Sequence, residues 1–82
     1  MDRLSTKSAV VLVVDDDEAA RLMMATTLEQ AGFTVLTAAN CAAARAVFEQ
    51  ETLNIILLDV LLPDGDGFTL CAEFLQHPRG RD

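Results

Sequence analysis

The sequence predicts an α/β protein, a three-layer doubly wound parallel sheet in one domain spanning residues 1–82. Short aliphatic runs alternate with longer segments whose apolar residues recur at helical spacing. Strands and helices that alternate in this way pair in parallel with right-handed crossovers. The first and third runs are apolar on both faces, whereas the second is half polar and suits a sheet edge. We therefore expect the strand order 2-1-3.

The first strand is predicted at residues 9–14 (AVVLVV), and it ends at four consecutive acidic residues, 15–18. Acidic residues suit the start of a helix, and Asp17 is the expected cap. The helix that follows is predicted from apolar residues at helical spacing, namely Ala20, Met24, Leu28 and Ala31. Leu22 and Ala25 flank this stripe. Gly32 is expected to end this helix.

The second strand is predicted at residues 33–37 (FTVLT), followed by a helix at 41–51 with Asn40 as its N-cap. This helix has a predicted core stripe of Ala44, Val47 and Phe48. The third strand is predicted at 53–58 (LNIILL), and it ends in a carboxylate, Asp59.

A loop is predicted at residues 63–67 (PDGDG), where Asp64 and Asp66 are expected to build the turn and not to bind a ligand. The third helix is predicted from a set of apolar residues at helical spacing, Phe68, Cys71, Ala72 and Leu75. The His77–Pro78 step is expected to end it. Residues 1–7 are expected to be flexible and 77–82 to form a tail.

Composition excludes several functional classes. Thirteen acidic against six basic residues give a net charge of −7, which disfavours binding to a nucleic-acid backbone. The longest apolar run has far fewer than the roughly 20 residues of a membrane span, and no secretory signal is recognisable. Cys41 and Cys71 form no CxxC motif, so we expect two buried, reduced thiols in a cytoplasmic protein.

Acidic residues follow both strands that flank the predicted switch point of the sheet. In the order 2-1-3 the ligand crevice lies between the carboxyl ends of the first and third strands. Asp15 and Asp16 follow the first strand and Asp59 follows the third. Neighbouring strands are about 4.8 Å apart, so these carboxylates should converge. Their mutual repulsion favours a bound cation, and an all-oxygen site beside solvent suits Mg²⁺ next to an Asp that can attack phosphorus.

These motifs resemble the receiver domain of bacterial response regulators in two-component signalling. The resemblance is carried by VVLVVDDDE and by NIILLDVLLPDGDGF, and it covers about residues 9–76. It implies the flavodoxin-like receiver fold, in which the sheet has five strands. It also implies a phosphorelay protein of the cytoplasm, not an enzyme acting on a separate substrate, although complete receivers can catalyse their own phosphorylation and dephosphorylation.

By position, the resemblance makes Asp59 the phosphoacceptor. The phosphoryl group would come from a phosphohistidine on a sensor histidine kinase or a histidine phosphotransfer protein. Mg²⁺ would be bound by Asp15, Asp16 and Asp59, together with the backbone carbonyl of Leu61. No nucleic acid or membrane is expected to bind this domain.

The chain departs from the family after the third helix. Complete receivers continue through a strand ending in Ser or Thr and another ending in Lys, whereas the one lysine here is Lys7. We therefore expect a receiver truncated after its third βα unit, with impaired phosphorylation. An apolar third strand without a following partner predicts self-association through its edge, or partial folding.

Two alternatives remain open. The chain could be a phosphorylation-independent interaction module, a vestigial receiver whose acidic residues no longer function. Less favoured is a fragment of a haloacid dehalogenase-like phosphatase with Asp15 as nucleophile, because the Gly-Thr that should follow Asp17 is absent. The residue that traps phosphoryl, Asp59 or Asp15, separates a receiver from a phosphatase.

Overall fold

A computed structural model describes residues 9–77 of the chain. Strands and helices alternate in the order β1 (Val10–Val14), α1 (Glu18–Gln30), β2 (Thr34–Ala38), α2 (Cys41–Gln50) and β3 (Ile55–Leu58). The chain then forms two short strands and a helix, β4 (Leu61–Leu62), β5 (Gly65–Asp66) and α3 (Gly67–Gln76). The predicted loop at 63–67 thus contains β5, which forms a small antiparallel pair with β4 just before the loop, and no pattern in the sequence predicts this pair.

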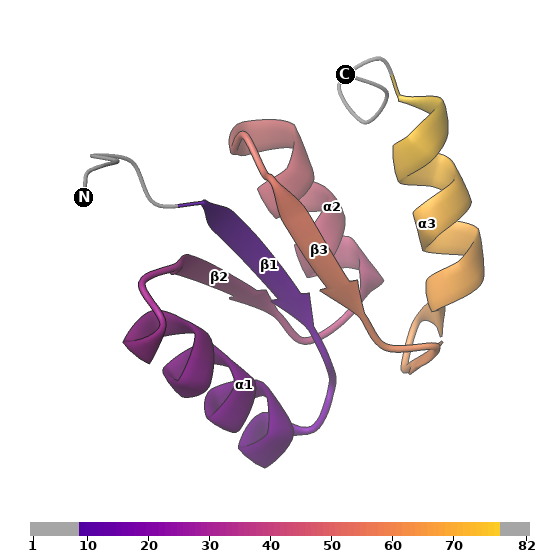
Figure 1. The fold of residues 1–82 in the computed structure, drawn as a ribbon. Coiled ribbons are helices and arrows are strands. Elements are labelled where there is room, and N and C mark those ends of the chain that lie inside the picture. The colour runs from indigo at the N-terminus through magenta and orange to yellow at the C-terminus, as the bar shows by residue number, and fades with distance from the viewer. Residues whose placement is uncertain (1–8, 78–82) are drawn as a thin grey trace.

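The main sheet is parallel with the order β2-β1-β3, which confirms the predicted topology. Figure 1 shows α1 on one face of the sheet and α2 with α3 on the other. Strand β1 lies in the centre, and residues Val11–Val14 are at most 1% exposed. A strand that is apolar on both faces needs cover from both helix layers, and β1 receives it.

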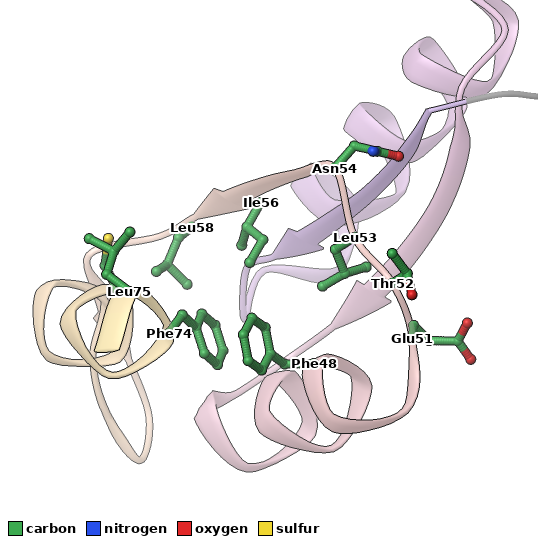
Figure 2. A pocket seen from close by; sticks show the side chains of 10 residues that line it. Phe48, Glu51, Thr52, Leu53, Asn54, Ile56, Leu58, Phe74 and Leu75 are labelled. Carbon is green, nitrogen blue, oxygen red and sulfur yellow. The ribbon is translucent and has the colours of Figure 1, made fainter. Parts of the chain in front are cut away.

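The larger part of the core lies between the sheet and the α2–α3 layer. Leu12 of β1, Ala44 of α2 and Leu70 of α3 are each at most 1% exposed. The rings of Phe48 and Phe74 stack with centroids 4.2 Å apart. Beside these rings, α2, β3 and α3 leave an apolar groove of about 460 Å³ (Figure 2).

The ends of the first two helices follow the predicted signals. Gly32, which follows the C-cap residue of α1, has a φ of +101°, a conformation that favours glycine. Asn40 accepts a hydrogen bond from the Ala43 N–H at 2.8 Å and caps α2 as expected. Asp17 occupies the N-cap position of α1, but its side chain makes no capping hydrogen bond.

Helix α1 covers its face of the sheet with most of the predicted residues, but Leu22, expected beside them, is 66% exposed. Ala25 is buried, and Ala20, Met24 and Leu28 are half-buried. Ala31, also predicted on this stripe, is exposed because it lies at the C-cap, past the last turn.

The predicted core stripe of the third helix is wrong. Phe68 and Leu75 are 73% and 57% exposed, and Cys71 and Ala72 are exposed as well. The helix instead buries a different set, Gly67, Leu70 and Phe74. Both sets have helical spacing, so periodicity alone could not choose the inward face. The same rotation corrects the expectation of two buried thiols, since Cys41 is buried but Cys71 is exposed.

Helix α3 ends at Gln76, and His77 is its C-cap. The segment expected to be flexible, 1–7, and the tail beyond His77 lie outside the described residues. None of the helices in 9–77 combines the length and the apolar character that crossing a membrane demands.

Candidate functional site

Two strand ends position the acidic residues. The backbone N–H of Asp15 donates to the Ala38 carbonyl at 3.1 Å, and that of Asp59 donates to the Val14 carbonyl at 3.0 Å. Each bond extends the sheet ladder past the end of a strand. The backbones of Asp15 and Asp59 are therefore held in register at the carboxyl edge of the sheet.

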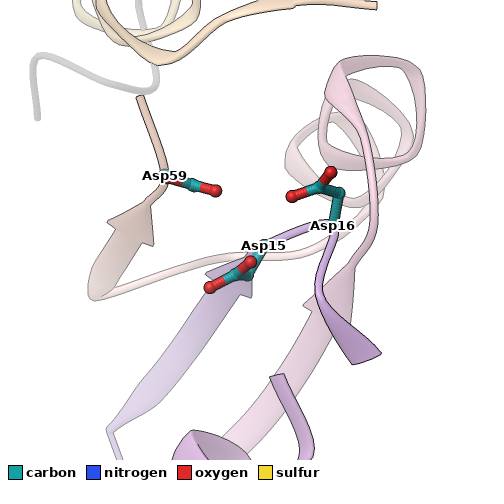
Figure 3. A group of neighbouring side chains, drawn as sticks. All are labelled: Asp15, Asp16 and Asp59. Atoms are coloured by element: carbon teal, nitrogen blue, oxygen red, sulfur yellow. The ribbon is translucent and has the colours of Figure 1, made fainter. Parts of the chain in front are cut away.

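The predicted convergence of the three carboxylates is confirmed. Asp15, Asp16 and Asp59 each present an oxygen, and these atoms all lie within 4.8 Å of one another. Figure 3 shows Asp59 extending from the end of β3 toward the pair that follows β1. Asp15 and Asp59 are half-buried and Asp16 is exposed, so the cluster lies at the boundary between sheet and solvent.

The donor set of this acidic cluster fits a hard divalent cation. It offers carboxylate oxygens from three side chains, and Mg²⁺ is usually bound through one or two carboxylates with waters completing the shell. A hollow of about 400 Å³ reaches the cluster, lined by Asp15, Asp59 and apolar residues of β1, α1 and β3. Repulsion between the carboxylates is a cost that a cation would offset.

Hydrogen bonds from neighbouring groups stabilise the backbone turn at this site. The Arg21 guanidinium of α1 donates to the Asp15 backbone carbonyl at 2.8 Å. The Asp15 carboxylate accepts from the backbone N–H of Asp17 at 3.0 Å, which tightens the turn after β1. Leu61, whose carbonyl is a predicted ligand, is the first residue of β4, and that role stays a prediction.

Gly67 has a role at this site that no pattern in the sequence predicts. Its N–H donates to the Val60 carbonyl at 2.7 Å. A Cβ added at this position would collide with the carbonyl oxygen of Asp59 and lie 3.0 Å from its carbonyl carbon. The start of α3 can therefore approach the backbone of Asp59 only because residue 67 has no side chain.

The two acidic residues of the predicted loop lie outside the cluster and cap helices, in agreement with a structural role. Asp66 accepts from the Thr69 N–H at 2.7 Å at the start of its own helix α3. Asp64 accepts from the N–H groups of Cys41 and Ala42, at 2.7 and 3.0 Å, at the start of α2. These backbone hydrogen bonds hold the pKa of each carboxyl below its usual value.

Cys41 is not an activated thiol. Its side chain lies in the core beside the acidic loop, where it is 1% exposed. Burial, followed by the hydrogen bond and the negative charge of Asp64, raises the pKa of Cys41. A raised pKa disfavours the nucleophilic thiolate, so Cys41 acts as a small core residue.

Comparison with known proteins identifies the family. The family model for the response regulator receiver domain matches residues 11–81. Over 54 residues, the chain is 41% identical to the transcriptional regulatory protein GltR of Pseudomonas aeruginosa, covering 66% of this chain and 22% of GltR. The chain thus spans about a fifth of the length of this relative.

Solved structures agree with this match. The chemotaxis response regulator CheY4 of Vibrio cholerae superposes with a TM-score of 0.89 at 32% identity, covering 92% of this chain and 62% of CheY4. The response regulator TrrA of Thermotoga maritima, solved in complex with Mg²⁺-BeF, gives a TM-score of 0.80 at 26% identity, covering 83% and 59% of the two chains. The topology, the converging carboxylates and the matched span lead to one conclusion, that this chain belongs to the response regulator receiver family.

Proposed function

We propose that this chain is a phosphoacceptor of two-component signalling, in which Asp59 receives a phosphoryl group at a Mg²⁺-dependent site. The donor in this proposal is a phosphohistidine on a sensor histidine kinase or a histidine phosphotransfer protein. The observation that carries the proposal is the convergence of Asp59 with Asp15 and Asp16 at the carboxyl edge of the sheet. The similar protein TrrA, solved with Mg²⁺-BeF, supports the choice of metal.

Each acidic residue has a distinct chemical role in this proposal. An Asp59 carboxylate oxygen attacks phosphorus and forms the new P–O bond, while the P–N bond to the donor histidine breaks and leaves its electron pair on the imidazole. Asp15 and Asp16 hold Mg²⁺, which when bound offsets negative charge on the phosphoryl oxygens. The Asp59 N–H bond to Val14 fixes the attacking group on the sheet.

The product stays on the chain, so we propose a protein that is modified and not an enzyme with a separate substrate. The proposed compartment is the bacterial cytoplasm. The free thiols of Cys41 and Cys71 are compatible with a reducing environment.

Phosphoryl trapping tests this function. Incubating the chain with Mg²⁺ and a small acyl phosphate donor should add one phosphoryl group, detected as an increase in intact mass. Hydroxylamine should then displace the group as phosphate and leave a hydroxamate on the aspartate, which identifies an acyl phosphate. Asp59→Asn should abolish the increase, because an amide cannot serve as the nucleophile. A phosphoryl group found on Asp15 would instead favour the phosphatase alternative, and none on either residue would contradict the proposal.

Metal binding tests the same site independently. Asp16→Asn should weaken Mg²⁺ binding by about tenfold or more, because it removes charge from a ligand group. Asp17→Asn is the matched control: it removes the same charge from the adjacent exposed residue, which lies outside the cluster. If Asp59→Asn leaves Mg²⁺ affinity unchanged, the acidic cluster is not the metal site.

The open edge of β3 suggests that the chain can also self-associate. Among residues 9–77, β3 pairs only with β1, so its other edge carries no strand. Ile55 and Leu57 are 42% and 39% exposed on one face, and Ile56 and Leu58 line the apolar groove on the other. Edges of this kind pair readily with another chain. We therefore propose that two copies associate through the edge of β3.

Ile55→Lys should weaken this association, because a charged side chain on an edge strand opposes pairing. Sedimentation at tens of micromolar should show oligomers of the wild-type chain and mainly monomers of the variant. Leu22→Lys is the control, since Leu22 is exposed but lies on α1. Added salt should promote association, because it screens the net charge of −7 on each copy. A wild-type monomer that unfolds cooperatively would contradict the prediction.

A further inference from the structure

The carboxylate of Asp64 caps a helix that is distant in sequence. One of its oxygens accepts from the Cys41 N–H at 2.7 Å and the other from the Ala42 N–H at 3.0 Å. These are the first two residues of α2, whereas Asp64 lies between β4 and β5, in the segment that follows the proposed phosphoacceptor. The hydrogen bonds therefore join this segment to another element of the fold.

The first turn of α2 depends on this contact. A helix begins with four N–H groups that have no partner within it. Asn40, the local cap, accepts from Ala43 with its side chain and from Ala44 with its carbonyl oxygen. The Ala44 bond is the first bond within the helix, so the helical N–H groups that need an outside partner are those of Cys41, Ala42 and Ala43, and Asp64 satisfies the first two. Two side chains thus divide the capping of α2, and only one of them belongs to the adjoining sequence.

The start of α2 is a rigid anchor. Cys41 and Ala44 are 1% and 0% exposed in the main core cluster. A built Cβ on Gly65 would lie only 3.1 Å from the Cys41 sulfur, so the backbone beside Asp64 also packs closely on α2. Farther along, Arg45 of α2 forms a two-bond ion pair with Glu73 of α3, at 2.7 and 2.9 Å.

We propose that Asp64 is a positioning residue for the metal and phosphoryl site. It would hold the acceptor segment, residues 59–64, in place through the N-terminus of α2. The segment is fixed at its start by the Asp59–Val14 hydrogen bond and at its far end by Asp64. Leu61, whose carbonyl is the proposed backbone ligand, lies between these attachments. This inference rests on the proposed function, because positioning matters only if the segment serves such a site.

Two neighbouring caps provide matched controls. Asp66 carries the same charge in the same loop but caps its own helix, α3. Asp66→Ala therefore measures the effect of removing one negative charge near the acidic cluster. Asn40 caps α2 from within its own sequence, so Asn40→Ala measures the effect of weakening α2 alone.

Titration of the full chain with Mg²⁺ alone, followed by amide chemical shifts, tests the proposal. Asp64→Ala should weaken Mg²⁺ binding by about tenfold, the lower end of the range for residues that orient metal ligands. Asp66→Ala and Asn40→Ala should each stay within about twofold of wild type. Asp64→Asn retains one oxygen acceptor without the charge and should restore most of the affinity. A merely electrostatic effect would leave the asparagine variant as weak as the alanine variant.

Amide hydrogen exchange gives a readout that does not require metal. Asp64→Ala should accelerate exchange in residues 61–66 as well as at the start of α2, whereas Asn40→Ala should affect α2 alone. The proposal is overturned if the exchange of 61–66 is unchanged in Asp64→Ala, or if its Mg²⁺ affinity equals that of both controls. Failure of the wild-type chain to bind Mg²⁺ would instead overturn the proposed function, and the exchange comparison would still decide whether Asp64 anchors the segment.

Discussion

Replacing Phe74 with alanine is expected to lower the free energy of unfolding by about 3 kcal/mol, the usual cost of removing a buried ring. Phe74 is 7% exposed and stacks on Phe48 with centroids 4.2 Å apart. Phe68, on the same helix, is 73% exposed. Its replacement should cost less than about 0.5 kcal/mol, because exposed substitutions rarely do more.

Urea unfolding of the two variants beside the wild type measures this difference. Both substitutions remove the same ring from α3, so the comparison isolates burial from helix propensity. A larger loss at Phe68 than at Phe74 would show that α3 buries the face with Phe68, and similar losses would contradict the difference in burial between the two rings. Phe74→Ala should also enlarge the groove between α2, β3 and α3, of which Phe74 forms one wall.

The sheet could be predicted because its signals are local and strong. The run that became β1 is apolar on both faces, and only a central strand covered on both sides satisfies such a pattern. Once β1 is central, the carboxyl ends of β1 and β3 lie side by side. The convergence of Asp15, Asp16 and Asp59 then follows from topology, without any information about side-chain contacts.

The orientation of α3 could not be predicted in the same way. Apolar residues occupy most of its circumference, so two different stripes satisfy the helical period. The choice depends on tertiary packing: Leu70 and Phe74 join the main core cluster, and Gly67 closely approaches the backbone of Asp59. A glycine in the string PDGDG has the signature of a turn, and that signature does not reveal which backbone it faces.

The capping role of Asp64 could not be predicted from the sequence, for a related reason. Its partner Cys41 is 23 residues away in sequence, so no local motif connects the two. Asp66 caps a donor only three residues ahead, a spacing that can be recognised from sequence. A cap within one helix can therefore be predicted from the sequence, whereas a cap supplied by a distant element can be identified only from the folded structure.

Gly67→Ala is expected to be the most damaging substitution near the proposed site. The new Cβ would meet the carbonyl oxygen of Asp59 and lie 3.2 Å from the Val60 Cα, and both obstacles are backbone. Overpacking of this kind costs up to about 3 kcal/mol, and the high end applies because no side chain can rotate away. Since the displaced group is the backbone of Asp59, phosphoryl trapping and Mg²⁺ binding should fall together with stability.

Gly65→Ala separates this collision from a general effect of adding a methyl group to the loop. Its Cβ would lie 3.1 Å from the Cys41 sulfur, a contact that requires a shift of only a few tenths of an ångström, whereas the Cβ at residue 67 would overlap backbone atoms. Thermal unfolding should therefore place Gly65→Ala between wild type and Gly67→Ala, with Mg²⁺ affinity close to wild type. Equal behaviour of the two variants would mean that α3 does not press on Asp59. A Gly67→Ala chain that is destabilised yet still binds Mg²⁺ normally would show that the acidic cluster tolerates movement of the Asp59 backbone.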